Sequence, residues 1–130
     1  GEHNDCVAMA KQFADRTHFV HLRSCYIFPN GNFTEASHLG GRGHLIELCR
    51  IFEKAEQEGK CNSGRRLPMR VDHGMTFTDE PGGVFDESNH GHNAGYTLLG
   101  RMFAMGQIQG VIATVDDELG IEYKQPGFYD

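Results

Sequence analysis

The sequence has little of what marks a membrane-bound, secreted or nucleic-acid-binding protein. The longest apolar run, residues 106–115, is well short of the ~20 residues that a membrane span requires. The N-terminus has no basic segment followed by an apolar one, which is the pattern of a signal peptide. The net charge is −6 and no basic stripe gathers, which argues against a nucleic-acid or anionic-membrane surface. These absences predict a cytoplasmic protein that binds a small molecule.

Closely spaced cysteine pairs are also missing. The chain has four cysteines and none of them forms a CxxC pair: Cys6, Cys25, Cys49 and Cys61. An intracellular chain keeps such thiols reduced, and a zinc site would need recurring close ligand pairs. We therefore expect neither a disulfide framework nor a cysteine-based zinc site.

The chain length is that of one domain. Its 130 residues are enough to bury a core, but they are only about half of the ~250 that a complete (β/α)8 barrel usually needs. We therefore treat residues 1–130 as a single domain.

The spacing of apolar residues predicts five regular elements. They are a helix capped by Asp5, a strand, a helix ended by Gly59, a strand and a long helix, over residues 7–14, 18–23, 44–57, 67–71 and 96–115. Residues 29–43 are expected to form a turn and a glycine-rich loop, and residues 74–95 a long acidic loop. The order of elements predicts an α/β layer fold in which helices cover a parallel sheet.

The pair Asp72-His73 directly follows the second predicted strand. At a strand end, a carboxylate can hold a divalent cation while an adjacent imidazole moves a proton. The alternative is structural, with Asp72 capping a turn and His73 hydrogen-bonded at the surface. His21, near the end of the first strand, adds an imidazole of the kind that binds Mn²⁺ or Fe²⁺ together with a carboxylate. The alternative for His21 is a structural role in the core, with its ring nitrogens hydrogen-bonded.

Three further side chains are suited to the same site. Arg23 and Arg70 can each bind a substrate carboxylate through two hydrogen bonds, and the alternative for each is an ion pair with a neighbouring acid. Tyr96 stands where the long loop returns to a helix, so its phenol can act as an acid or a base. Ordinary packing is the alternative for Tyr96.

Several stretches, in the same order along the chain, resemble the C-terminal portion of the mannonate dehydratases, a metal-dependent (β/α)8-barrel family. These stretches are Asn4-Asp5 with Ala8-Met9-Ala10, residues 19–24 (FVHLRS), Phe33 with Glu35-Ala36 and His38-Leu39, residues 68–74 (PMRVDHG), and residues 93–96 (NAGY) with Gly100-Arg101. They are spread over residues 4–101, and an ordered set is more specific than any single motif.

The resemblance implies loss of water from D-mannonate to give 2-keto-3-deoxy-D-gluconate in hexuronate catabolism, assisted by Mn²⁺ or Fe²⁺. It implies that His21 and Asp72 are metal ligands and that His73 and Tyr96 are the proton-transfer pair. It also implies substrate-binding or supporting roles for Arg23, His38 and Arg70.

The resemblance also implies an incomplete site. The family's other metal ligands, a histidine and a cysteine, lie on earlier barrel strands, so we expect the C-terminal βα units of a (β/α)8 TIM barrel. Such a partial barrel is expected to need the missing segment, or a homo-oligomer, to cover its sheet edges and apolar faces. The alternatives are a noncatalytic barrel fragment or binding module, and another metal-dependent sugar-converting barrel enzyme.

Overall fold

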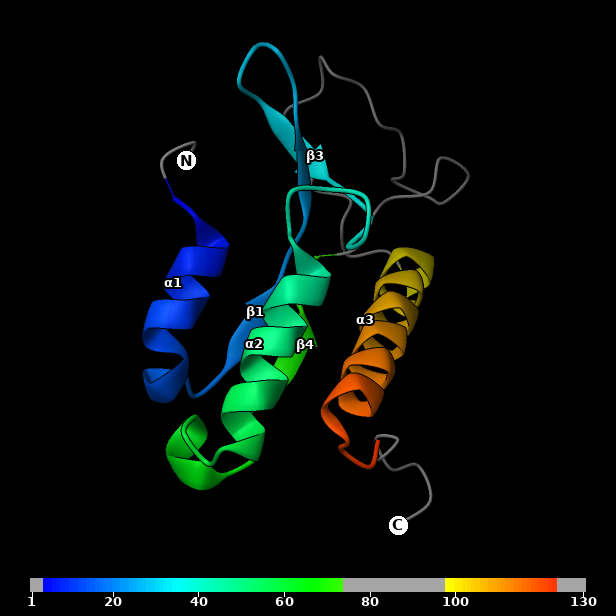
Figure 1. Cartoon of the computed structure of the whole chain (residues 1–130). Helices are drawn as coiled ribbons and strands as arrows, with labels where there is room; N and C mark the ends of the chain where they lie inside the picture. The colour runs from blue at the N-terminus through cyan, green and yellow to red at the C-terminus, as the bar shows by residue number, and fades with distance from the viewer. Residues whose placement is uncertain (1–3, 74–97, 124–130) are drawn as a thin grey trace.

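A computed structural model of the chain describes residues 4–73 and 98–123 (Figure 1). This part of the chain contains the α-helices α1 (Cys6–Phe13), α2 (Leu45–Gln57) and α3 (Leu98–Leu119). Its strands are β1 (Val20–Leu22), β2 (Cys25–Ile27), β3 (Phe33–Glu35) and β4 (Met69–Val71). Two short 3-10 turns, Ala14–Arg16 and Asn62–Gly64, follow α1 and precede β4.

The strands β1 and β4 form a parallel pair, as the order of the elements predicts. Their register places Val20 opposite Met69, His21 opposite Arg70, and Leu22 opposite Val71. Helix α2 lies between them in the sequence, and α1 and α3 lie on either side of α2 (Figure 1). The mixed α/β arrangement is therefore confirmed, although each strand is only three residues long.

An antiparallel hairpin, which the sequence pattern does not predict, follows β1. The strands β2 and β3 pair with Cys25 opposite Glu35 and Ile27 opposite Phe33. The turn expected at residues 29–32 is present at its tip, but the expectation of a loop through residues 29–43 is wrong where β3 forms. Three alternating residues are too short a run for periodicity to detect, and the strand depends on its partner.

The helix ends follow the sequence signals. Asp5 caps α1, because its Oδ1 accepts hydrogen bonds from the backbone N–H groups of Val7 at 3.0 Å and Ala8 at 2.9 Å. Gly59 follows α2 with φ +66°, a left-handed conformation that glycine adopts without a Cβ penalty. The predicted boundaries of α2 are thus confirmed to within a residue.

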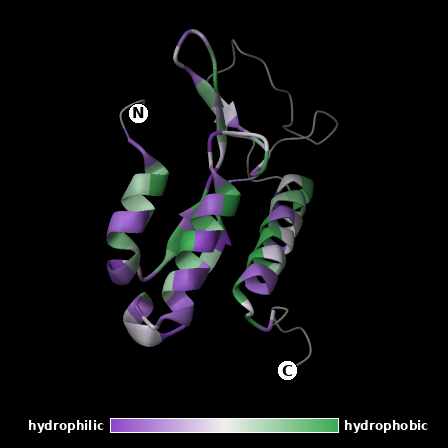
Figure 2. Cartoon of the chain, in the orientation of Figure 1, coloured by the Kyte–Doolittle hydropathy of each residue, from purple (hydrophilic) through white to green (hydrophobic). Residues whose placement is uncertain are grey.

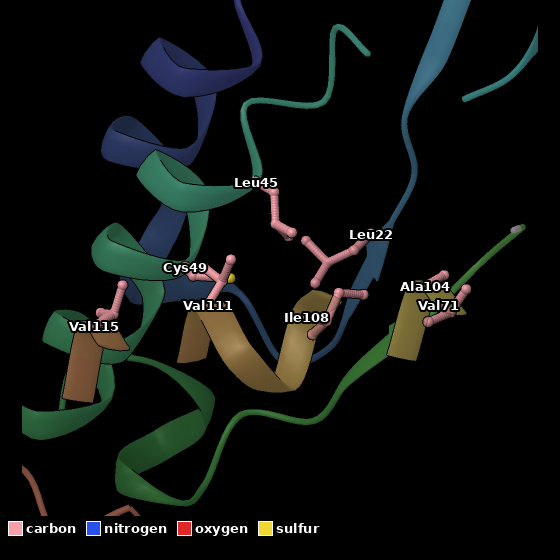
Figure 3. Packing of buried hydrophobic residues seen from close by; sticks show 8 residues of the cluster. All are labelled: Leu22, Leu45, Cys49, Val71, Ala104, Ile108, Val111 and Val115. Carbon is pink, nitrogen blue, oxygen red and sulfur yellow. The ribbon is translucent and has the colours of Figure 1, made fainter. Parts of the chain in front are cut away.

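The core lies between the helices and one face of the parallel strands (Figure 3). Its larger cluster joins β1, α2, β4 and α3 through Leu22, Leu45, Cys49, Val71, Ala104, Ile108, Val111 and Val115. A second cluster joins α1, the other side of α2 and the segment before β4 through Ala10, Ala14, Phe52, Ala55, Cys61 and Leu67. Helix α2 therefore packs on both sides, while its outward side is hydrophilic (Figure 2).

Helix α3 is long enough and apolar enough to cross a membrane by length and composition, a test that the core helix of a soluble protein also passes. Residues 106–115, the longest apolar run of the sequence, form only part of this helix, which extends over Leu98–Leu119. Only 28% of its apolar window is buried. The buried part, which includes Ala104 and Val115, packs on α2 and β4.

All four cysteines are free thiols, as expected. Cys49 is fully buried in the larger cluster, where burial raises the pKa of its thiol to about 12. This thiol is a packing group at neutral pH.

Candidate functional site

Polar side chains gather where the two parallel strands end. The strand pairing continues one step beyond β4, because the Asp72 N–H donates to the Leu22 carbonyl at 3.1 Å. Leu22 and Val71 face the helices, and successive strand residues point to opposite faces. His21 and Arg70, paired in register, therefore lie on the face opposite the helices, and both are exposed.

Asp72 lies among three of the predicted site residues. Its Oδ1 is 3.6 Å from the Nδ1 of His21. Its Oδ2 is 4.0 Å from the Nη1 of Arg23 and 3.7 Å from the Nε2 of His73. The two oxygens therefore face different neighbours, an exposed imidazole on one side and a guanidinium with a buried imidazole on the other.

His73 is buried, with 7% of its surface exposed, so the alternative that places it at the surface is wrong. On its other side, its Nδ1 is 3.9 Å from the Oε1 of Glu35. The imidazole therefore lies between two carboxylates, one from the end of β4 and one from β3.

Glu35 also binds Arg23. Its Oε1 accepts a hydrogen bond from the Nε of Arg23 at 3.0 Å and a second, shorter one from Nη2. These bonds raise the pKa of Arg23 above its ordinary value, so the guanidinium stays charged. The alternative of an ion pair with a neighbouring acid is thus present for Arg23, and its expected role toward substrate stays a prediction.

Glu35 was not among the residues expected to serve the site. The sequence placed Glu35 inside a predicted loop. Only the pairing of β2 with β3 brings Glu35 beside Arg23. The one available signal was the stretch Glu35-Ala36 within the family resemblance.

The remaining predicted residues are placed differently. His38 is buried, and its Nε2 is 2.9 Å from the Leu22 carbonyl oxygen, so it ties the loop after β3 to the end of β1. Arg70 is exposed, and its Nε donates to the Val71 carbonyl at 3.4 Å. Tyr96 lies outside the described residues. The substrate and proton-transfer roles of these three residues stay predictions.

Two of the expected metal ligands lie side by side. The Nδ1 of His21 and the Oδ1 of Asp72 come from neighbouring strands and are 3.6 Å apart. Within residues 4–73 and 98–123, no group of three or more histidine, cysteine, aspartate or glutamate side chains is suited to hold an ion. The described residues thus supply a pair of donors and not a complete cage.

A separate groove lies between α1 and α2, lined by residues such as Lys11, Glu47, Arg50 and Lys54. Several of its charged residues pair with one another, as in the 3.2 Å contact between Lys11 and Glu47. None of the predicted site residues lines it, so the strand ends remain the candidate site.

Comparison with known proteins identifies the family of this chain. The model of the D-mannonate dehydratase (UxuA) family matches residues 1–121. Mannonate dehydratase 2 of Agrobacterium fabrum is 37% identical over 118 residues, which cover 89% of this chain and 28% of the relative. Mannonate dehydratase of Saccharophagus degradans is 35% identical over 115 residues, covering 87% of this chain and 28% of the relative.

The chain thus spans about 28% of the length of these curated relatives. The match nevertheless includes both parallel strands, the hairpin and the Asp72-His73 step. On this evidence the chain belongs to the D-mannonate dehydratase family.

Proposed function

We propose that this chain forms the C-terminal part of a D-mannonate dehydratase, a cytoplasmic (β/α)8-barrel hydro-lyase of hexuronate catabolism. The observation that carries the proposal is the position of Asp72, between His21 on one side and His73 on the other. Family membership supports the substrate, and the position at the carboxyl ends of parallel strands is where barrel enzymes hold their active sites.

The barrel itself is supported by the two faces of the sheet. Helices pack on the side of Leu22 and Val71, as the outer helices of a barrel do. His21 and Arg70 lie on the opposite face, which is the interior of a barrel. Their exposure here matches an interior that further strands would enclose.

His21 and Asp72 fit the proposed Mn²⁺ or Fe²⁺. An imidazole nitrogen and a carboxylate oxygen are the donors that these ions accept, and 3.6 Å is close enough for both to serve as neighbouring ligands after a small adjustment. When bound, the ion would stabilise the negative charge that develops as the C2 proton leaves. The missing ligands would come from earlier strands, as the resemblance implies.

The reaction requires one group to remove the C2 proton of D-mannonate and another to protonate the departing C3 hydroxyl. The electrons of the C2–H bond form the C2=C3 bond as water leaves, and the resulting enol becomes the 2-keto acid. We assign the two proton transfers to His73 and Tyr96. His73 is held for this role by its burial between two carboxylates.

The two arginines have separate roles in this proposal. Arg70 is exposed beside His21 in the register of the sheet, so its guanidinium is available to bind the substrate carboxylate. Arg23 is already engaged by Glu35 and faces Asp72. Arg70 is therefore the better candidate for direct contact with substrate.

The test is the formation of 2-keto-3-deoxy-D-gluconate by the longest natural form of the protein that carries this sequence. D-mannonate should be converted with Mn²⁺ and not after chelation. Asp72→Asn should lower turnover at least about 100-fold, because the carboxylate serves both the ion and the site. The control Asp117→Asn changes an exposed carboxylate on α3 and should leave turnover unchanged.

The same assay distinguishes the alternatives. Conversion of another sugar or sugar acid in place of D-mannonate would indicate a different barrel enzyme. Metal binding without turnover in that longest form would indicate a noncatalytic module. Unchanged turnover in Asp72→Asn would exclude Asp72 as a metal ligand.

A further inference from the structure

We infer that Glu35 is a positioning residue, which acts through Arg23 to hold the guanidinium against Asp72. The inference rests on the proposed function, since it concerns the same site. No expectation from the sequence assigned a role to Glu35. Four observations support it: the burial of Glu35, its bonds to Arg23, the ring of Phe33 and the close packing behind the hairpin.

The first observation is that Glu35 is an acid with one unsatisfied oxygen. Its side chain is 6% exposed, and its Oε2 has no hydrogen-bond partner among the described residues. Burying a carboxylate oxygen without a partner costs free energy, so a residue with a purely structural role would normally satisfy both oxygens. This arrangement is typical of a group retained for the site.

The second and third observations concern the guanidinium of Arg23. Glu35 fixes its Nε and Nη2, and the ring of Phe33 lies 5.2 Å from its central carbon. Phe33 and Glu35 are two residues apart on β3, so their side chains share one face of the hairpin. Glu35 therefore binds the edge of the guanidinium, and the Phe33 ring packs on its flat side. The remaining nitrogen, Nη1, is directed at Asp72.

The fourth observation is the close packing behind the hairpin. The Ala36 N–H donates to the Ser24 carbonyl at 2.9 Å, which extends the pairing of β2 and β3 past Glu35. A Cβ at Gly41 would approach the Ser24 Oγ to 2.1 Å, so the glycine loop lies directly on this segment. Glu35 therefore has little freedom to follow Arg23 if the guanidinium moves.

The two carboxylate oxygens of Asp72 therefore have different roles. Its Oδ1 faces His21, whereas its Oδ2 faces Arg23 and His73. A guanidinium that is held in place stabilises the charge on Oδ2 and limits the positions that the carboxylate can take. Without Glu35, the guanidinium would move, and Asp72 would lose this restraint.

The experiment is a double-mutant cycle between Glu35→Gln and Arg23→Gln in the longest natural form of the protein, assayed with D-mannonate and Mn²⁺. Glu35→Gln keeps the shape of the side chain and removes its charge. It should lower kcat about 10- to 100-fold with less than about a 3-fold change in KM, the range found for groups that orient metal ligands. On the Arg23→Gln background, the same change should cost less than about 3-fold, because its partner is already gone.

A matched control is Glu118→Gln, which also removes an acid that binds an arginine through two nitrogens, here the exposed Arg50. It should leave kcat unchanged. Unaltered kcat in Glu35→Gln, or an equal loss with and without Arg23, would overturn the inference while the dehydratase activity of the parent protein remained. If Glu35→Gln does not fold, Glu35→Asp replaces it in the same cycle, because it keeps the charge but withdraws it by one methylene.

A second measurement separates this inference from the proposed function. In NMR spectra of the parent protein, the Arg23 Nε–H should be protected from exchange with water, and in Glu35→Gln its exchange should accelerate at least about 10-fold. A parent protein that fails to convert D-mannonate would overturn the proposed function but not this result. Unchanged exchange would overturn the positioning role whether or not D-mannonate is the substrate.

Discussion

Glu53 of α2 and Asp116 of α3 face each other inside the interface between the two helices. They are 8% and 4% exposed, so both carboxyl groups are buried in this interface and interact electrostatically. Burial and the charge of Asp116 raise the pKa of Glu53 to about 7, and burial also raises the pKa of Asp116. The interface between α2 and α3 therefore favours the protonated form of the Glu53 carboxyl group.

This pair predicts that stability falls as pH rises. The pKa of Glu53 is raised from 4.5 to about 7, so the folded chain binds more protons than the unfolded chain between these values. The contribution of Glu53 to the free energy of unfolding should therefore be largest below about pH 4.5 and decline as the pH rises to about 7, by at most roughly 3 kcal/mol. Arg66 opposes the effect, whereas Glu56 adds to it.

Urea unfolding at pH 5 and pH 8 measures this dependence. In Glu53→Gln the amide cannot ionise, so the loss of stability between the two pH values should be smaller than in the parent chain. The control Glu122→Gln removes an exposed carboxylate and should retain the parent's pH dependence. An equal loss in Glu53→Gln would mean that another group titrates.

Gly41→Ala should destabilise the chain, because an added Cβ would lie 2.8 Å from the Ala36 Cβ and 3.0 Å from the Cys25 carbonyl oxygen. Overpacking of this kind costs about 1–3 kcal/mol. The matched change Gly106→Ala places a Cβ in open space on α3 and should stabilise by about 0.5–1 kcal/mol through helix propensity. Thermal unfolding of both variants would show opposite shifts of Tm, and a shared direction would contradict the packing argument.

His21→Ala should weaken Mn²⁺ binding about 10- to 100-fold in the longest natural form of the protein, because it removes one of the proposed donors. Electron paramagnetic resonance of free Mn²⁺ measures the affinity without any assay of turnover. His18→Ala is the matched control, since the His18 imidazole lies 3.2 Å from the Asn62 side chain and away from Asp72. Equal Mn²⁺ affinity in parent and His21→Ala would remove His21 from the ligand set.

The chain in isolation should associate with itself through α3, whose outer side exposes Leu98, Leu99, Met102, Phe103 and Met105. Apolar side chains gathered on one helix face favour contact with another surface over contact with water. Sedimentation velocity should show association that increases with concentration, and Met102→Lys should raise the monomer fraction. Thr114→Lys, at an exposed position nearer the end of α3, is the control. A monomeric parent chain at all concentrations would contradict this prediction.

The sequence by itself determined the local elements. Apolar spacing placed α2, Asp5 and Gly59 marked helix ends, and the order of the elements indicated a parallel strand pair. These features depend on residues close together in the chain, where periodicity and capping act directly. The same reasoning placed Asp72 and His73 at the end of β4, because the strand stops where the apolar run stops.

Only the tertiary structure decided how these residues meet. The pairing of β2 with β3 brings Glu35 back to Arg23, twelve positions away, and turns a residue expected in a loop into a buried neighbour of His73. The contact between Glu53 and Asp116 likewise joins two helices that are far apart in the sequence. Such contacts depend on packing between distant segments, so no local pattern predicts them.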